Sequence, residues 1–439
     1  MTSGIQEAIR KIDRMAIQAT GWQSRLGVLG TLLAAGIMLP LLTGTRAAAQ
    51  EAAPSYNVLY TFTGGADGYL PSALIRDVAG NLYGTTNAGG NYGAGVVFKL
   101  DPKGKLKVLY TFTGGSDGAY PPGGVVRDAA GNLYGTVSSG GEYGAGGVFK
   151  LDPQGKETVV YSFTGGKDGS NPLAGIIRDT AGNLYGTTGY GGKNSGFGSC
   201  CGVAFEVDAS GKETVLHTFT GPPDGAYLQS GVLLRDGSGN LYGITVEGGN
   251  TGKPCPSVGC GVVFKLDSVG KETVLHRFTG TDGSDSWSNL IRDSAGNLYG
   301  TTTSGGKYGW GVVFSLDPQR KESVLYAFSG GNDGTSPGAG VIRDSAGNLY
   351  GTTVWGGNEK SSSCPYGSQG CGVVFQLDPQ GKEHVLYAFT GGTDGGNPGS
   401  DLIQDKSGNL YGTTSYGGNT SSSCPLGNIG CGVIFKLTP

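Results

Sequence analysis

Short hydrophobic segments recur along residues 56–437, separated by turns rich in Gly, Asp, Asn and Pro. In the first full set they cover residues 73–76, 82–86, 96–100 and 107–112, which we name strands a, b, c and d. Their β-branched and aromatic residues predict β-strands. Strands c and d are apolar at successive positions, which is typical of strands buried on both faces. Long amphipathic helical patterns are absent after residue 45, so the pattern predicts an all-β fold.

The same four strands recur seven times. The motif Gly-Asn-Leu-Tyr-Gly lies between strands a and b, and consecutive copies are 51 to 61 residues apart. Its first glycine stands at Gly80, Gly131, Gly182, Gly239, Gly296, Gly347 and Gly408. Four-stranded antiparallel units of this length predict the blades of a β-propeller. A β-solenoid is the alternative, but it would need shorter and more uniform coils.

The two ends of the repeat region are out of phase in a way that predicts a closed ring. The region opens with a d strand at 57–62 that has no c strand before it, and it ends with a c strand at 433–437 that has no d strand after it. Pairing the two leaves no exposed sheet edge. We therefore predict a seven-bladed propeller over residues 56–437, with blades at about 72–112, 123–163, 174–219, 231–278, 288–328, 339–389 and 400–437 plus 57–62.

The connections divide into two kinds. The a–b and c–d turns are tight, as in Asp101-Pro102-Lys103-Gly104, whereas the d–a and b–c loops are long and rich in glycine. Because consecutive antiparallel strands alternate in direction, we expect the tight turns on one face and both long loops on the other, the long-loop face. Either long loop could cross between blades. We favour d–a, which makes strand a innermost. The long-loop face holds the insertions and most differences between copies, so we expect it to be the working surface.

Aromatic side chains and a recurring aspartate are the candidate ligand-binding groups on this face. Exposed rings stack on sugars or anchor protein partners, although they also cover the ends of blades. The aspartate of each d–a loop suits a cation or a polyhydroxylated ligand, but a residue present in all seven copies is better explained as turn chemistry. One Asp per blade also lacks the density of a calcium loop. The candidates are Tyr92, Tyr120, Tyr143, Tyr190, Tyr227, Trp310, Trp355 and Tyr416, with Asp67, Asp117, Asp168, Asp224, Asp282, Asp333 and Asp394.

Two further positions are defined by comparing the copies. Three residues after each loop aspartate the copies diverge, reading Leu70, Tyr120, Asn171, Tyr227, Asp285, Ser336 and Asn397. Before the a–b turn, Arg-Asp recurs six times and becomes Gln404-Asp405 in the seventh copy. We interpret this pair as structural, with Asp closing the turn and Arg bridging to an adjacent blade.

All eight cysteines fall in b–c loops. Local spacing favours three disulfides, Cys255–Cys260, Cys364–Cys371 and Cys424–Cys431, with cross-links between blades 3 and 4 or 6 and 7 as the alternative. Cys200 and Cys201 are adjacent, and form either a strained vicinal disulfide or remain reduced.

Catalytic and metal-binding motifs are not evident. The three histidines lie in d strands, and His217 and His276 replace the Tyr of Val-Leu-Tyr, so we interpret them as packing variants. There is no C-x2-C pair near a histidine, no Ser-His-Asp grouping, no P-loop and no H-E-x-x-H. We therefore expect no metal and no cofactor. Propeller enzymes do gather isolated residues around the axis, so catalysis stays open.

The net charge and the N-terminal segment indicate which classes of partner and which cellular location to expect. A net charge of -3 without a basic patch argues against nucleic acid. Arg10, Lys11 and Arg14 precede an apolar run at 26–42 and the motif Ala47-x-Ala49, which predicts a signal peptide at 1–49. An uncleaved N-terminal anchor is the alternative. Either reading places the repeats outside the cytoplasm, and cleavage would leave no stable membrane insertion. A monomer is expected.

Arg-Asp-x-Ala-Gly-Asn-Leu-Tyr-Gly-Thr-Thr, then Gly-Gly, then Gly-Val-Val-Phe-Lys-Leu-Asp-Pro-x-Gly, resembles the GloVer (Gloeobacter/Verrucomicrobium) tandem repeat over about residues 56–437. The resemblance implies an exported bacterial protein without an established activity. Members often carry a C-terminal sorting anchor, whereas this sequence stops at Leu437-Thr438-Pro439, so we expect a secreted or periplasmic protein. We expect a binding or scaffolding module for a glycan or a protein. The rivals are a propeller hydrolase or lyase acting on carbohydrate or lactone, and a purely structural envelope protein.

Overall fold

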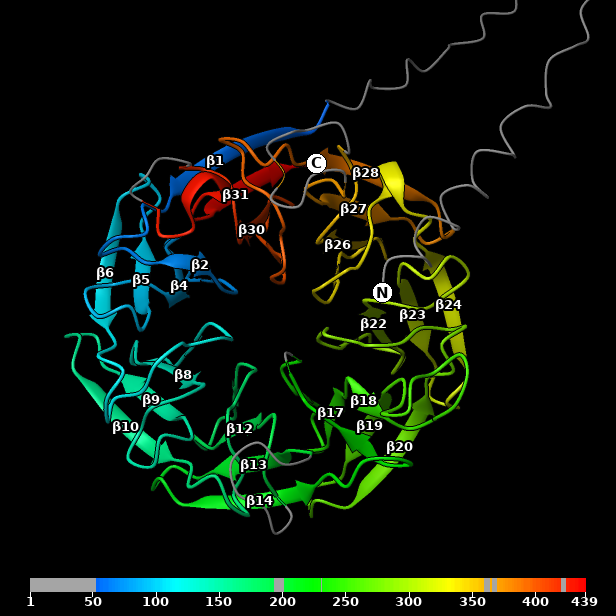
Figure 1. Cartoon of the computed structure of the whole chain (residues 1–439), viewed down its shortest axis with the longest axis horizontal. Helices are drawn as coiled ribbons and strands as arrows, with labels where there is room; N and C mark the ends of the chain where they lie inside the picture. The colour runs from blue at the N-terminus through cyan, green and yellow to red at the C-terminus, as the bar shows by residue number, and fades with distance from the viewer. Residues whose placement is uncertain (1–52, 193–200, 230, 359–363, 365–368, 420–423) are drawn as a thin grey trace, which may run out of the picture. The chain divides into compact units, whose positions relative to one another are not determined.

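The computed structural model describes residues 53–192, 201–229, 231–358, 364, 369–419 and 424–439. The described residues belong to one compact unit, Ala52–Pro439. Figure 1 shows this unit as a ring of blades around a central axis. The predicted signal peptide lies outside the described residues and stays a prediction. Within the described residues, no helix is long and apolar enough to span a membrane.

The described part of the chain forms seven antiparallel blades, as the repeat predicted, and in each of them strands a, b, c and d are hydrogen-bonded in that spatial order. The d strands form the outer rim in Figure 1, so the d–a loop crosses between blades and strand a is innermost. The first four blades are β3 (Ile75–Arg76), β4 (Leu82–Ala88), β5 (Val96–Leu100) and β6 (Leu106–Thr111); β7 (Val126–Arg127), β8 (Leu133–Val137), β9 (Gly147–Leu151) and β10 (Glu157–Ser162); β11 (Ile177–Arg178), β12 (Leu184–Thr187), β13 (Val203–Val207) and β14 (Glu213–Thr218); and β16 (Leu234–Arg235), β17 (Leu241–Ile244), β19 (Val262–Leu266) and β20 (Glu272–Arg277).

The remaining blades follow the same order. They are β21 (Ile291–Arg292), β22 (Leu298–Thr302), β23 (Val312–Leu316) and β24 (Glu322–Ala327); β25 (Ile342–Arg343), β26 (Leu349–Thr353), β27 (Val373–Leu377) and β28 (Glu383–Ala388); and β29 (Ile403–Gln404), β30 (Leu410–Thr414), β31 (Val433–Thr438) and β1 (Ser55–Thr61). Within the loops, β2 (Tyr69–Pro71) adds to β4, β15 (Gly225–Ala226) pairs with β18 (Glu247–Gly248), and two 3-10 turns cover Gly331–Asp333 and Gly427–Ile429.

The ring is closed by the N-terminal strand. β1 pairs with β31 in antiparallel register, with Val58 opposite Phe435 and Thr61 opposite Val433. Figure 1 shows β1, in blue, beside β31, in red, in this blade. The predicted pairing of an unpaired d strand with an unpaired c strand is therefore confirmed, and it completes the fourth strand of blade 7.

A ladder of phenylalanine pairs holds neighbouring blades together. In each pair, the Phe that ends the d strand of one blade meets, edge to face, the Phe in strand c of the next blade. The ring centroids are 5.0–5.4 Å apart at all seven junctions. The rings are fully buried, and the edge-to-face geometry is the favoured one for aromatic pairs. Phe62 and Phe98 form the pair that joins the last blade to the first.

The second glycine of Gly-Asn-Leu-Tyr-Gly makes room for this ladder. In β12, Gly186 lies opposite Phe205 of β13. A Cβ atom at Gly186 would lie 2.6 Å from the Phe205 ring and 2.9 Å from Ile176. The motif therefore combines a turn glycine with a packing glycine.

Gly186→Ala is expected to lower the free energy of unfolding by about 1–3 kcal/mol, because the added methyl overpacks the Phe205 site. Gly237→Ala is the matched control, since a Cβ at this turn position would meet no atom within 4 Å. We expect the control to stay within about 0.5 kcal/mol of the parent protein in chemical denaturation. Equal stability of the two variants would contradict the packing role of Gly186.

The Arg-Asp pairs fasten the blades on the tight-turn side, as predicted. Asp77 accepts hydrogen bonds from the Asn81 amide at 2.9 Å and from the Tyr83 hydroxyl at 3.1 Å, which closes the a–b turn. Arg76 lies over the ring of Tyr411 in the preceding blade, 5.6 Å from its centroid. Five further arginines stack on a preceding blade's tyrosine in the same way, at 5.3–5.9 Å.

Three of the predicted disulfides are present: Cys255–Cys260, Cys364–Cys371 and Cys424–Cys431. Each is local to one b–c loop, so the alternative cross-links between blades are not formed. Cys201 is also disulfide-bonded. Cys200 lies outside the described residues, and the prediction for the adjacent pair is not settled.

Candidate functional site

The two long loops of a blade are hydrogen-bonded to one another, and in six of the seven blades they are also hydrogen-bonded to the preceding blade. The Ala119 amide donates to the Ser139 carbonyl at 2.8 Å within blade 2, and the Tyr120 amide donates to the Ala94 carbonyl of blade 1 at 2.8 Å. Tyr120 has a φ of 56°, in the left-handed region. The equivalent residues are all left-handed, with φ between 51° and 57°: Leu70, Asn171, Tyr227, Asp285, Ser336 and Asn397.

This conformation explains why the copies diverge at that position. The recurring feature there is a backbone conformation and its hydrogen bonds, and the side chain is not fixed by either. Left-handed conformations disfavour β-branched residues, and none of the seven is β-branched. The variable position is therefore defined by its backbone conformation, and its side chain can differ from copy to copy.

The loop aspartates are placed by local hydrogen bonds. Asp117 accepts from the Thr113 amide at 2.7 Å and from the Tyr110 hydroxyl at 3.0 Å. Asp67, Asp168, Asp333 and Asp394 have the same kinds of partner. These hydrogen bonds are those expected of a turn residue, which was the alternative interpretation of the recurring aspartate. A ligand role for the aspartates stays a prediction.

The predicted aromatic residues are spread around the ring. Tyr92 is 65% exposed and Trp310 is 49% exposed, so both are available to a partner. Tyr120 and Tyr143 are also exposed, whereas Trp355 and Tyr416 are partly buried. The structure brings together one pair, Tyr190 and Tyr227, whose hydroxyl oxygens are 3.2 Å apart and whose ring centroids are 5.1 Å apart. The aromatic set stays a ligand-binding prediction.

A cavity of about 400 Å³ lies at the axis of the ring. Its position follows from its lining, to which every blade contributes residues just ahead of its innermost strand. Asn87, near the end of β4, and Ser415, directly after β30, also line it where the b–c loops begin, so it belongs to the long-loop side. One lining residue from each blade in turn is Leu70, Pro122, Leu173, Val232, Trp287, Ala339 and Asp401.

A hydrogen-bonded chain at the cavity wall joins four consecutive blades. The Val232 amide donates to the Asn289 side-chain oxygen, and the Asn289 side-chain nitrogen donates to the Asp401 carboxylate. Asp401 also accepts from the Gly340 amide at 2.8 Å. Burial raises the pKa of the Asp401 carboxyl, and the Gly340 hydrogen bond opposes that rise in part. The cavity therefore holds one carboxylate next to an amide, with Trp287 nearby, 41% exposed.

Sequence reasoning missed these axial residues. A usable signal existed at the residue two positions before Ile-Arg in strand a, which reads Ala73, Gly124, Gly175, Val232, Asn289, Gly340 and Asp401. Same-register positions of the innermost strands meet at the axis of a closed ring, so the two polar departures had to lie near each other. Trp287 has no counterpart among the copies and could be noticed in the same alignment.

Comparison with known proteins identifies relatives by sequence pattern and by fold. A family model described as the Gloeobacter/Verrucomicrobia repeat matches residues 43–255 and 255–439. No curated protein matches the chain. Among solved structures, the extracellular domain of BT3049 from B. thetaiotaomicron, described as a hybrid two component system, is 14% identical with a TM-score of 0.52, over 88% of this chain and 41% of that one.

Two other solved structures are similar to the chain. The extracellular domain of BT4673 from B. thetaiotaomicron, described as a one component system, is 11% identical with a TM-score of 0.50, over 86% of this chain and 39% of that one. The gluconolactonase XC5397 from Xanthomonas campestris is 11% identical with a TM-score of 0.42, over 87% of this chain and 88% of that one. The chain thus spans about two fifths of the two extracellular domains. Identities this low show a shared fold alone.

Proposed function

This chain belongs to the Gloeobacter/Verrucomicrobia repeat family, and from that premise we propose that it is an exported binding module whose ligand docks in the axial cavity. The observation that carries the proposal is a cavity built by all seven blades, with Trp287 and the Asn289–Asp401 pair in its lining. Ligand pockets in proteins have about 300–1,000 Å³ and combine apolar walls with a few convergent polar groups. A volume of about 400 Å³ suits a small molecule.

The lining favours a small carbohydrate. An exposed tryptophan offers a flat apolar face to a sugar ring. Asp401 and Asn289 offer acceptors and a donor for hydroxyl groups. Glycoside hydrolysis uses two carboxyl groups, whereas Asp401 is the one carboxylate in the described lining. We therefore propose carbohydrate binding here, and leave hydrolysis without a supporting observation.

Export is part of the same proposal. Three local disulfides are typical of proteins that fold in an oxidising compartment. The N-terminal residues 1–49 carry the charge and hydropathy pattern of a signal segment. Both features support a secreted or periplasmic location.

Trp287→Ala is expected to weaken binding of a carbohydrate hit from a glycan array by about 10-fold or more, because a central aromatic anchor contributes over about 1 kcal/mol. Trp310→Ala is the matched control, since Trp310 is similarly exposed but lies on a b–c loop outside the axial cavity. We expect it to bind like the parent protein. Loss of binding in the Trp310 variant with retention in the Trp287 variant would move the ligand to the loop aromatics and overturn the axial site.

A further inference from the structure

The outer rim carries a repeated group of side chains at the junctions between consecutive d strands. Each group combines a residue near the end of one d strand, the aspartate of the following loop, and a glutamate that begins the next d strand. The three tyrosine groups are Tyr110–Asp117–Glu157, Tyr161–Asp168–Glu213 and Tyr326–Asp333–Glu383. In each of them the tyrosine hydroxyl donates to the aspartate at 3.0 Å.

Two consecutive junctions replace this tyrosine with histidine. His217 of β14, Asp224 and Glu272 of β20 form the first group, and His276 of β20, Asp282 and Glu322 of β24 form the second. In each group the imidazole nitrogen and the two carboxylate oxygens lie within 4.8 Å of one another. In the first group the histidine belongs to blade 3 and the glutamate to blade 4, 55 residues later in the chain (272 minus 217), so linear spacing does not reveal the set.

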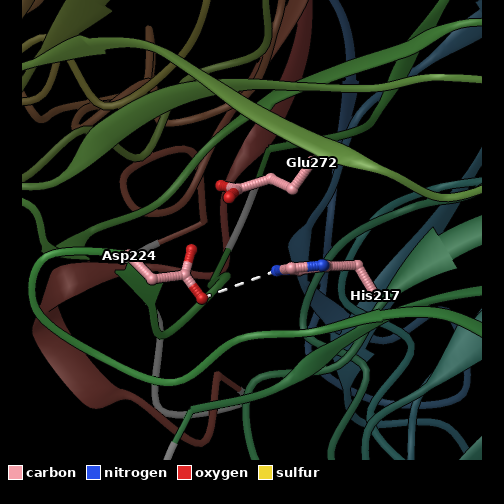
Figure 2. Close-up of side chains that lie close together, drawn as sticks. All are labelled: His217, Asp224 and Glu272. Atoms are coloured by element: carbon pink, nitrogen blue, oxygen red, sulfur yellow. Dashed lines mark ion pairs between the residues drawn. The ribbon is translucent and has the colours of Figure 1, made fainter.

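The His217 group lacks the hydrogen bond that joins the tyrosine to the loop aspartate in the tyrosine groups. His217 Nε2 lies 3.5 Å from Asp224 Oδ2, and Nε2 makes no hydrogen bond within the described protein although it is buried. Glu272 Oε1 is also buried without a hydrogen-bond partner there, as is the same oxygen of the glutamate in each of the other groups, so the unpartnered imidazole nitrogen is what sets the His217 group apart. Figure 2 shows the imidazole and the two carboxylates turned toward a common space. Buried polar atoms without partners are uncommon and call for an explanation.

One imidazole nitrogen with two carboxylate oxygens is a ligand set that zinc accepts, usually with water in the fourth position. Two ligands on a tetrahedral zinc ion with bonds of about 2.0 Å are about 3.3 Å apart, and the His217–Asp224 separation of 3.5 Å is close to that. Calcium and magnesium prefer oxygen ligands alone. We propose that His217, Asp224 and Glu272 bind one divalent transition-metal ion of the zinc class, joining blades 3 and 4 at the rim.

The second group does not carry the same proposal. His276 Nε2 is 3.0 Å from Asp282 Oδ2, which is a hydrogen bond, and Asp282 also accepts from the Thr279 amide at 2.7 Å. His276 therefore takes over the tyrosine's role as a partner of the loop aspartate. The chain thus provides an internal control for the His217 site.

The test uses the full chain after treatment with a chelator, titrated with ZnCl2 by calorimetry and followed by thermal unfolding. We expect one zinc ion per chain and an upward shift of the melting temperature. His217→Tyr restores the residue that the five other junctions outside the two histidine groups carry. It should weaken zinc binding by about 100-fold or more and remove the shift, since loss of a ligand exceeds the effect of losing its outer-shell support. His276→Tyr should retain both.

A second variant tests the glutamate ligand while leaving His217 in place. Glu272→Gln preserves the side-chain shape and removes the charge, so zinc binding should again fall, while the metal-free melting temperature confirms that the variant folds. Absence of stoichiometric zinc binding by the parent chain would overturn the proposal. So would equal binding by the parent protein and His217→Tyr, or loss of binding in His276→Tyr alone.

Discussion

Phe62→Ala is expected to lower the free energy of unfolding of the propeller by about 3–5 kcal/mol. Phe62 is fully buried, and its ring packs edge to face on Phe98 with 5.4 Å between centroids. The residue follows β1, the strand that completes blade 7, while Phe98 belongs to blade 1. The substitution therefore removes a side chain from the junction where the ring closes. Urea denaturation, followed by intrinsic fluorescence, measures the loss.

Phe112→Ala is the matched control at an internal junction. Phe112 is also fully buried and packs on Phe149 at 5.1 Å. In a closed ring the two substitutions should lower the free energy of unfolding by similar amounts, because each junction buries an equivalent pair of phenylalanines. A Phe62 variant within about 1 kcal/mol of the parent, together with a strongly destabilised Phe112 variant, would mean that the N-terminal strand does not close the ring.

The sequence predicts the architecture well because its causes are local and recur. The Asp-to-Asn turn, the glycine opposite a core phenylalanine and the d-strand phenylalanine each act within one blade or between neighbours. Seven copies of the pattern therefore give seven blades. The two ends of the repeat region then predict ring closure, since β1 is a d strand without its c strand and β31 is a c strand without its d strand.

The candidate site is predicted less well for a physical reason. Motif reading favours residues that recur, such as the loop aspartates, yet a recurring residue in a repeat protein first serves the repeat. Asn289 and Asp401 are departures from the pattern at one register position, and they meet because the ring brings every innermost strand to the axis. His217 appeared to be a tyrosine replacement, and only the junction between blades adds Asp224 and Glu272 to it.

The free energy of unfolding is expected to decrease as pH rises from about 5 to 8. Glu157, Glu213 and Glu383 begin outer strands, and each has a pKa raised to about 7, first by burial and then by the neighbouring Asp117, Asp168 or Asp333. One carboxylate oxygen of each is buried without a hydrogen-bond partner in the described protein. The folded chain thus binds protons more tightly than the unfolded chain, in which the pKa is 4.5.

The sign and size of the effect follow from this difference. A carboxyl group with a raised folded-state pKa stabilises the fold fully below pH 4.5, and that contribution is lost as pH rises through about 7. A shift of this size corresponds to about 3 kcal/mol per group. Because the three groups are about half exposed, solvent screening reduces this to about 1 kcal/mol each. In denaturant unfolding at pH 5, 6, 7 and 8, the share of the loss that comes from these three groups should be about 3 kcal/mol.

A triple variant isolates the contribution of these three glutamates. Glu157→Gln, Glu213→Gln and Glu383→Gln together remove the three charges while leaving His217, His276 and His384 in place. The triple variant should be more stable than the parent at pH 8 and should depend less on pH. Glu142→Gln, at an exposed loop position, should leave the parent profile unchanged. A parent profile that is flat or rises between pH 5 and 8 would show that these carboxyl groups do not resist ionisation in the folded ring.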